Sequence, residues 1–457
     1  MTDSPHLDDS TLINFVDGLI DAPDEVARIR RHLQDCLECH ETAQEYRELQ
    51  SVIREGRVPA LTGDPSDEPD AAGLADVLAY AEELRQEEAR AAVIVPPILA
   101  EDPTHWGSLV AGSTDYRRPM VVRNLLTAAQ GELERQPARA LAIATLASDI
   151  ADHITPGAFR ADIVLYCRGS AWKERANALR YLGRYPEALQ ALDRAEEWFA
   201  QTVNPELDLA VLDYIRAWVV AQLDRTDEAL RLARRCATTF MRYGDLEREN
   251  HAGLLEAAIL FDRREFTKSR DAFLALRGAI QAQGHLPTLA RLYSNLGNVL
   301  AELGDLDASG KYLHQAMKLF EELGLTTERV RVRWILGRIM VQAGRSNEAL
   351  VMLDQVAAEF DALEMVDEAG CAQLLRAETL LALGQPATVP ALCRALIDRF
   401  ARIGAHHSAL AALAFLREAS ERGPVTPQVV RHVRVFLEAL RTHPDRVFVP
   451  PPTDPAA

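Results

Sequence analysis

The sequence predicts an all-α protein in which a small helical head is followed by an α-solenoid of about six to seven helical hairpins. The composition, 48% hydrophobic and 26% charged over 457 residues, is that of an ordinary globular chain. A pattern of small residues recurs every 40 or 41 residues from about residue 165 to 400, which is typical of a helical repeat. Near the N-terminus, the segment HLQDCLEC at residues 32–39 places one His and two Cys at helical spacing. We therefore expect a head at 1–56, a linker at 57–118, repeats at 119–441 and a disordered tail at 442–457.

The head is expected to contain three short helices. The first runs from Ser10 to Ile20, where Ser10 or Thr11 can cap it, the second from Pro23 to about Cys36, and the third from Leu37 to about Arg54. Helices of this length bury little apolar surface, so a metal that cross-links them would supply much of the folding free energy.

Four residues of the head form a candidate zinc site: His32, Cys36 and Cys39, with His6 lying 26 residues upstream of His32. Thiolate sulfur and neutral imidazole are the ligands that four-coordinate Zn²⁺ prefers. A chance Cys-x-x-Cys pair or a redox dithiol is the alternative. A redox dithiol would need a preceding strand and a thioredoxin-like pattern, whereas both flanks here are polar helix. The sequence therefore favours zinc, with His40 or a ligand from outside the chain as substitutes for His6.

The linker contains one further helix. Residues 57–72 are rich in Pro, Asp and Gly. An amphipathic helix is predicted from about Leu74 to Arg90, and the sequence offers it no obvious partner within the chain. Its apolar stripe comprises Leu74, Val77, Leu78, Ala81 and Leu84.

The repeats are anchored at one turn position per hairpin. Five residues after each anchor, and seven before it, comes a small residue or Val, which lets the two helices of a hairpin pack closely. A degenerate hairpin at 119–153 precedes these repeats and a capping helical segment at 405–441 follows them. The anchors are Gly183, Asp224, Arg264, Gly304, Gly344 and Gly384; the residues after them are Ala188, Ala229, Ser269, Ser309, Ala349 and Val389; those before them are Ala176, Ala217, Ala257, Gly297, Gly337 and Ala377.

Stacked hairpins leave a surface lined by their first helices, and such a surface binds extended or helical peptides. Arg pairs with carboxylates through two hydrogen bonds and Trp offers a stacking face, so this groove suits a peptide carboxylate or an acidic segment. Alternatively, the tryptophans pack between repeats and the arginines are solvated. The groove residues by repeat position are Lys173, Asn177, Arg180, Tyr214, Trp218, Arg291, Asn298, Arg331, Trp334 and Arg338.

Charge and composition exclude several functions. Residues 1–92 carry 22 acidic and 8 basic side chains, a net of −14, and the rest of the chain holds the remaining −4 of −18. Such a head repels nucleic acid and attracts a basic partner. No leader and no apolar stretch of membrane-spanning length is present, so we expect a cytoplasmic protein. No Walker A loop, G-x-S-x-G or HExxH occurs, so we expect no enzyme. Four scattered cysteines, Cys167, Cys236, Cys371 and Cys393, are expected in the core.

The repeat pattern resembles the tetratricopeptide repeat, with helices longer than in its usual unit of about 34 residues. The head, from LINFVDGLIDAPDEVARIRRHL through HLQDCLEC, resembles the zinc-binding anti-sigma (putative zinc-finger) domain. That resemblance implies His6, His32, Cys36 and Cys39 as ligands. It also implies a sigma factor, of the extracytoplasmic-function type, as the partner of residues 1–92, with the helix at 74–90 in the position of the family's fourth helix.

Two functions follow from these resemblances. In the first, the head sequesters a sigma factor while the repeats bind a peptide or protein that shifts the equilibrium, or oxidation of Cys36 and Cys39 ejects zinc. In the second, the repeats are a protein–protein interaction scaffold with a structural zinc head and no sigma partner. Many relatives of the head continue into a membrane span, and this chain departs from that plan. The sequence identifies neither the sigma factor, nor the groove ligand, nor the oligomeric state.

Overall fold

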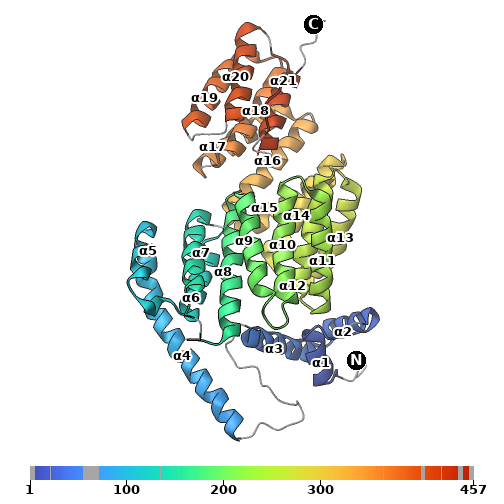
Figure 1. Cartoon of the computed structure of the whole chain (residues 1–457). Coiled ribbons are helices and arrows are strands. Elements are labelled where there is room, and N and C mark those ends of the chain that lie inside the picture. Colours follow the sequence, from blue (N-terminus) through green and yellow to red (C-terminus); the bar gives the residue numbers. More distant parts are fainter. Residues whose placement is uncertain are drawn as a thin grey trace. The chain divides into compact units, whose positions relative to one another are not determined.

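The computed structural model confirms the all-α fold class (Figure 1). It describes residues 6–20, 22–54, 71–133, 135–155, 157–363, 365–402, 407–423, 425–440 and 446–451. These residues form 21 α-helices and two short 3-10 helices, and within them no strand occurs. Among the same residues, no helix combines the length and the low polarity that crossing a bilayer requires.

Contacts divide the chain into two compact units. The first comprises residues 1–220 and 227–252, and the second comprises residues 221–226 and 253–457. The first unit therefore contains the head, the linker helix and the first repeats. The second contains the remaining repeats.

The head folds into α1 (Asp9–Val16), α2 (Pro23–Asp35) and α3 (Leu37–Arg54). The predicted caps at Ser10 or Thr11 are wrong, because Asp8 is the N-cap of α1 and its side chain accepts a hydrogen bond from the Thr11 backbone N–H at 2.8 Å. An Asp at this position also lies favourably at the positive end of the helix dipole. The head has a small core of its own, made by Leu12, Phe15, Val16, Val26, Ile29, Leu33, Cys39 and Ala43.

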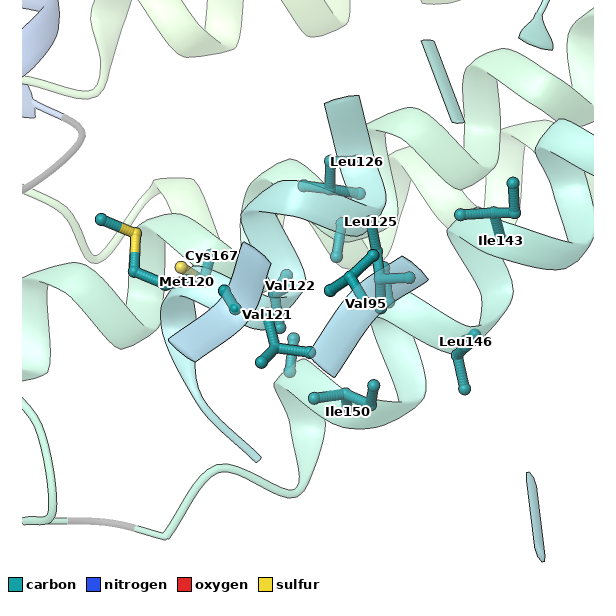
Figure 2. Close-up of a cluster of buried hydrophobic side chains, with 14 of the residues drawn as sticks. Val95, Met120, Val121, Val122, Leu125, Leu126, Ile143, Leu146, Ile150 and Cys167 are labelled. Carbon is teal, nitrogen blue, oxygen red and sulfur yellow. The ribbon is translucent and has the colours of Figure 1, made fainter. Parts of the chain in front are cut away.

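The linker helix is longer than predicted and has a partner. Helix α4 (Ala71–Ala100) continues through Pro96 and Pro97 and is followed by α5 (Pro103–Ala111) and a 3-10 turn (Thr114–Tyr116). Ala91, Val95 and Ile98 are buried at i, i+4 and i+7 in a core shared with α6 and α7, and Figure 2 shows Val95 within that cluster. Tyr80 and Leu84, within the predicted helix of 74–90, also pack against this core, so the expectation of a helix without a partner is wrong. The side chains of Leu74, Val77, Leu78 and Ala81 lie outside the described residues.

The remaining helices pair as hairpins in chain order. The degenerate hairpin and the capping segment of the sequence prediction correspond to α6/α7 and α20/α21. The hairpins are α6 (Pro119–Glu132) and α7 (Pro137–Asp152), α8 (Ala161–Tyr181) and α9 (Tyr185–Phe199), α10 (Glu206–Gln222) and α11 (Thr226–Arg242), α12 (Leu246–Asp262) and α13 (Phe266–Gln283), α14 (Leu286–Glu302) and α15 (Leu306–Glu322), α16 (Thr326–Gln342) and α17 (Ser346–Ala362), α18 (Val366–Ala382) and α19 (Val389–Arg402), and α20 (His407–Arg422) and α21 (Pro427–Leu440).

The small residues of the repeats lie where the two helices of a hairpin touch. A methyl group on Gly297 of α14 would lie 2.6 Å from Leu313 Cγ of α15. In the same hairpin the Ser309 hydroxyl donates to the Gly297 carbonyl at 2.6 Å, and the Ser269 hydroxyl donates to the Ala257 carbonyl at 2.7 Å. Only small side chains leave room for this approach, as the repeat pattern predicted.

A second periodic position was missed from the sequence. Sixteen residues after each anchor, every repeat buries one large apolar side chain almost completely. Large apolar residues are common on the buried face of a helix, so these positions stand out less in the sequence than the small residues do. They are Phe199, Phe240, Ile280, Phe320, Phe360 and Phe400.

Part of the C-terminal segment, predicted to be a disordered tail, is ordered against the repeats. Most of the segment predicted to be a disordered tail lies outside the described residues, but 446–451 are described. There the Phe448 ring packs against Phe436 with centroids 5.0 Å apart, and also against Phe415. The apolar core of the second unit therefore extends to this segment.

Candidate metal centre

The candidate ligands lie at a break between two helices. Helix α2 ends at Asp35, and its C-cap Cys36 has an extended backbone, with φ −118° and ψ 105°. Helix α3 restarts at Leu37, so Cys39 lies in its first turn. The expectation that His32, Cys36 and Cys39 share one continuous helical face is thus wrong. The break instead lets both thiols point toward the N-terminal segment that carries His6.

Three of the four predicted ligands converge. The ligand atoms of His6, Cys36 and Cys39 all lie within 4.8 Å of one another. The His6 Nδ1 atom lies 3.4 Å from Cys36 Sγ and 3.6 Å from Cys39 Sγ. Zn–S bonds of about 2.3 Å and Zn–N bonds of about 2.0 Å in a tetrahedron separate S and N by roughly 3.5 Å. The spacing of these atoms therefore matches the edges of a tetrahedral zinc site.

His32 lies at the side of this group. Its Nε2 atom is 3.3 Å from Cys39 Sγ, but it does not belong to the set of atoms within 4.8 Å of one another. His40 also lies outside that set, although its backbone N–H donates to the Cys36 carbonyl. His32 is the nearest candidate for a fourth ligand, and it approaches the site from the last turn of α2.

Two contacts around the ligands were not foreseen. The Glu38 carboxylate lies 3.3 Å from His6 Nε2, so it can accept a hydrogen bond from Nε2–H, which leaves the Nδ1 lone pair facing the two sulfurs. The Leu7 backbone N–H points at Cys39 Sγ at 3.4 Å. A carboxylate that orients a metal-binding imidazole is common in zinc proteins, and Glu38 between the two cysteines was the sequence signal for it.

The two thiols have different acidities. The backbone N–H of Cys39 stabilises the thiolate of Cys36 and lowers the pKa of Cys36 below its ordinary value. Burial raises the pKa of Cys39, whose side chain is only 3% exposed. Two sulfurs and imidazole nitrogen form a donor set that fits zinc, whereas Ca²⁺ and Mg²⁺ take oxygen ligands. The residues present thus fit the metal that the sequence predicts.

The head packs on the turn between α11 and α12, within the first unit. The Arg30 guanidinium of α2 forms an ion pair with Glu249 of α12 at 2.7 Å. Methyl groups built on Gly244 and Gly18 would lie 2.5 Å from the Phe15 ring and 2.9 Å from the Tyr243 ring, respectively. Burial raises the pKa of Glu249, and the nearby Arg30 charge opposes that shift. Nothing in the sequence had indicated this contact between head and repeats.

In the first unit, three of the five predicted groove residues contact one another. The Arg180 guanidinium lies over the Trp218 ring at 4.7 Å and donates to Asn177 Oδ1 at 2.8 Å. Lys173 Nζ pairs with Glu174 at 3.1 Å, and Tyr214 is half-buried against the core that contains Phe240. Burial disfavours the charge on Lys173, but Glu174 with other acidic neighbours outweighs it and raises the pKa of Lys173.

In the second unit, most of the predicted groove residues form ion pairs or apolar contacts with other residues of the repeats. Arg338 pairs with Glu302 at 2.6 Å, and Arg331 lies 3.9 Å from Glu368. Trp334 packs against the apolar cores of α17, α18 and their neighbours, as the alternative interpretation of the tryptophans holds. Arg291 and Asn298 lie half-buried on α14, and the Asn298 Oδ1 atom has no hydrogen-bond partner among the described residues.

Comparison with known proteins identifies the repeat type. The tetratricopeptide repeat family model matches residues 288–358, which cover the hairpin α14/α15 and most of α16/α17. This segment is therefore similar to tetratricopeptide repeats. Together with the common 40-residue period and the order of the helices, the match supports a small helical head followed by a tetratricopeptide-like α-solenoid. Comparison with curated protein sequences gives no match.

The solved structures that this chain is similar to share little sequence identity with it. A Rap protein complexed with competence and sporulation factor is 15% identical, covers 67% of this chain and 98% of its own, and has a TM-score of 0.44. Aspartyl phosphate phosphatase F from Bacillus subtilis is 9% identical, with coverages of 83% and 96% and a TM-score of 0.42. A STAND protein with a tetratricopeptide repeat sensor from Pyrococcus horikoshii is 12% identical, with coverages of 93% and 72% and a TM-score of 0.47.

Proposed function

We propose that this chain is a cytoplasmic zinc-binding anti-sigma factor, in which the head binds a sigma factor and the repeats bind a peptide or protein ligand. The observation that carries the proposal is the convergence of His6, Cys36 and Cys39 at the junction of α2 and α3. Zinc bound there, with His32 as the fourth ligand, would join the N-terminal segment to both helices and stabilise a head with a small core. The proposal includes no catalytic step.

The surface of the head supports a protein partner. Four large apolar side chains are exposed on it: Ile13 (40%), Leu19 (67%), Leu37 (72%) and Leu49 (49%). They stay exposed although the head contacts α11 and α12, a contact that includes Phe15, Gly18, Arg30 and Arg47. Exposed apolar residues surrounded by acidic ones fit a partner surface that has an apolar patch with basic residues around it. A sigma factor offers basic surfaces of this kind, because it must reach DNA.

The repeats would supply regulation. A ligand releases the sigma factor only if it binds the sigma-free state more tightly, by about 5.5 kcal/mol to move the equilibrium from 1:99 to 99:1. In the first unit, Arg180 and Trp218 present a guanidinium stacked on an indole, an arrangement suited to a peptide carboxylate beside an apolar side chain. The predicted groove residues Lys173, Asn177 and Tyr214 lie on the same two helices, α8 and α10.

A binding assay with purified sigma factors from the source organism tests the head. Immobilised full-length protein should bind one of them with a Kd below about 1 µM at 150 mM salt. The double variant Cys36→Ser/Cys39→Ser should bind at least tenfold more weakly, because the head loses its metal. The matched control Cys371→Ser replaces a buried repeat cysteine and should bind as the wild type does. If no sigma factor binds, the anti-sigma proposal fails.

The second candidate function is a protein–protein interaction scaffold whose zinc head is structural and has no sigma partner. The tetratricopeptide match favours it, because such repeats present stacked helices to peptides and proteins. Binding partners that are lost on Arg180→Ala and Trp218→Ala, but kept on Cys36→Ser/Cys39→Ser, would support the scaffold over the anti-sigma factor.

A further inference from the structure

The last hairpin of the second unit carries a cluster of rings on which the C-terminal segment lies. Three side chains of α20 and α21, Phe415, His432 and Phe436, contact the Phe448 ring, with ring centroids 5.4, 5.7 and 5.0 Å away. The contacts of His432 and Phe436 are edge-to-face, a geometry that aromatic rings prefer. We refer to Phe415, His432 and Phe436 as the aromatic surface.

The aromatic surface is held in place by the core of the hairpin. Phe436 is only 7% exposed, and Leu413, Leu416 and Val433, in the same cluster, are completely buried. These side chains fix α20 against α21, and they therefore fix the rings that the two helices carry. The surface thus belongs to the folded repeats, and the C-terminal segment covers it.

The C-terminal segment is anchored by one side chain. Phe448 is half-buried, whereas its neighbours Val447 and Val449 are 73% and 69% exposed. Arg446 and Pro450 are exposed as well. Side chains that alternate between a surface and solvent are typical of an extended chain. The repeats therefore recognise the phenylalanine and place no demand on the side chains beside it.

A main-chain hydrogen bond fixes the next part of the segment. His432 Nε2 lies 2.9 Å from the Val449 carbonyl oxygen, and because a carbonyl oxygen only accepts, the imidazole donates. Val449 precedes Pro450, and the residue before a proline is largely restricted to extended backbone. A segment that is already extended loses less conformational entropy when it binds. The recognised pattern is thus a phenylalanine, one residue of any kind and a proline.

We propose that the aromatic surface is a docking site for an extended Phe-x-Pro segment of a partner protein, and that residues 446–451 occupy it as an exchangeable internal competitor. The inference rests on the ligand-binding role proposed for the repeats, and it gives that role a place in the second unit and a sequence pattern. The chain's own segment shows which chemistry fits the surface: an aromatic anchor followed by a carbonyl that precedes a proline.

The internal segment can be exchanged because its contacts with the described residues centre on one aromatic ring and one hydrogen bond. Its advantage over a partner is the tether, since α21 ends at Leu440, six positions before Arg446. A short tether gives the segment an effective concentration of roughly millimolar. A partner protein overcomes this advantage when a second contact on its surface adds to the affinity, whereas a free peptide of the same sequence does not.

Fluorescence anisotropy with a labelled peptide of residues 446–451, Arg-Val-Phe-Val-Pro-Pro, tests the proposal on the full-length chain. The peptide should bind the Phe448→Ala variant at least about tenfold more tightly than the wild type, because the variant leaves the aromatic surface uncovered. The control peptide Arg-Val-Ala-Val-Pro-Pro should bind neither protein. No binding to Phe448→Ala, or equal affinity for the two proteins, would overturn the proposal.

Further substitutions in the Phe448→Ala background locate the binding. His432→Ala should weaken the peptide about fivefold or more, since it removes a hydrogen bond and a ring contact. The matched control His314→Ala replaces an exposed histidine of α15 and should change the affinity less than about twofold. If Phe448→Ala does not fold, a chain that ends at residue 445 takes its place. Unchanged affinity in His432→Ala would refute the site.

The alternative occupant of the aromatic surface is a second copy of this chain. Sedimentation should show no wild-type dimer that Phe448→Ala dissociates. Such a dimer would mean that the C-terminal segments exchange between copies, and it would overturn the proposal of a partner protein. The peptide assays contain no sigma factor, so failure of this inference and failure of the proposed function are separate results.

Discussion

At the scale of single residues, the turn within each repeat depends on one backbone conformation. All six predicted anchors have a positive φ, from +59° at Asp224 to +82° at Gly304. A left-handed residue ends the first helix and lets the chain reverse within three residues, which explains why four of the anchors are glycine. Asp224 and Arg264 adopt the same conformation with a side chain, and the fixed period rather than the residue type had indicated them.

Gly244 combines this conformation with a close contact. Its φ is +63°, and a methyl group there would lie within 2.5 Å of the Phe15 ring of the head. We expect Gly244→Ala to cost about 1–2 kcal/mol for the left-handed backbone and a further 1–3 kcal/mol for the overlap. Denaturant unfolding gives the total, and hydrogen exchange of residues 9–54 should accelerate.

Gly183→Ala is the matched control for Gly244→Ala. Gly183 also has a positive φ, +71°, but it has open space around its Cα. It should show the backbone cost alone and leave exchange in the head unchanged. Equal effects of the two variants on the head would show that its contact with the repeats does not depend on Gly244.

At the scale of helices, most of the repeat region could be predicted and much of the linker could not. A period of 40 residues fixes the lengths of the helices and the positions of the turns, and the small residues mark where the helices touch. The helix boundaries and the contacts within each hairpin could therefore be predicted from one sequence. Helix α4 was harder, because a single apolar stripe does not say what it packs against, and the helix continues through two prolines, Pro96 and Pro97. The packing of Val95 and Ile98 on α6 and α7 depends on contacts between distant segments.

The large buried residue of each repeat should carry much of its stability. Phe320 is 1% exposed in the core of α14, α15 and α16. Phe320→Ala should destabilise the second unit by about 3–5 kcal/mol, because it removes buried surface and leaves a cavity. Val351→Ala, at a residue 60% exposed, should change the free energy of unfolding by less than about 0.5 kcal/mol. Comparable losses in both variants would contradict the packing described for Phe320.

The cysteines of the head and of the repeats should differ in reactivity. Cys236 and Cys393 are fully buried, and burial raises the pKa of their thiols to about 12 and about 11. They stay protonated at pH 8 and, with Cys167 and Cys371, should react with Ellman's reagent only after unfolding. Cys36 and Cys39 should react in the native protein once a chelator is added, and not before. Six reactive thiols in the native, chelated protein would disprove this distribution.

At the scale of the molecule, the head is joined to the repeats by a contact that the sequence pattern did not reveal. The candidate ligands could be named from the residue types in HLQDCLEC and the upstream His6, although the helix breaks at Cys36 and the group that converges is His6, Cys36 and Cys39. The ion pair between Arg30 and Glu249 could not, since 219 residues separate the partners and neither belongs to a motif. The head is therefore held by this contact with the repeats as well as by its own small core.

Charge reversal tests the contact of the head with α12. Arg30→Glu or Glu249→Arg alone places like charges side by side in a pair whose side chains are each 23% exposed. Each should raise hydrogen exchange in α1–α3 about tenfold, and the double reversal Arg30→Glu/Glu249→Arg should restore it. A double variant no better protected than the single ones would show that the pair does not hold the head.

X-ray absorption at the zinc K-edge of the purified full-length protein is the most direct test of the metal centre. It should show one zinc per chain with two sulfur ligands at about 2.3 Å and two nitrogen ligands at about 2.0 Å. Cys36→Ser should lose the metal or replace one sulfur by oxygen. A protein that holds no zinc, or holds it through oxygen ligands alone, would contradict the assignment of His6, His32, Cys36 and Cys39 as the site that organises the head.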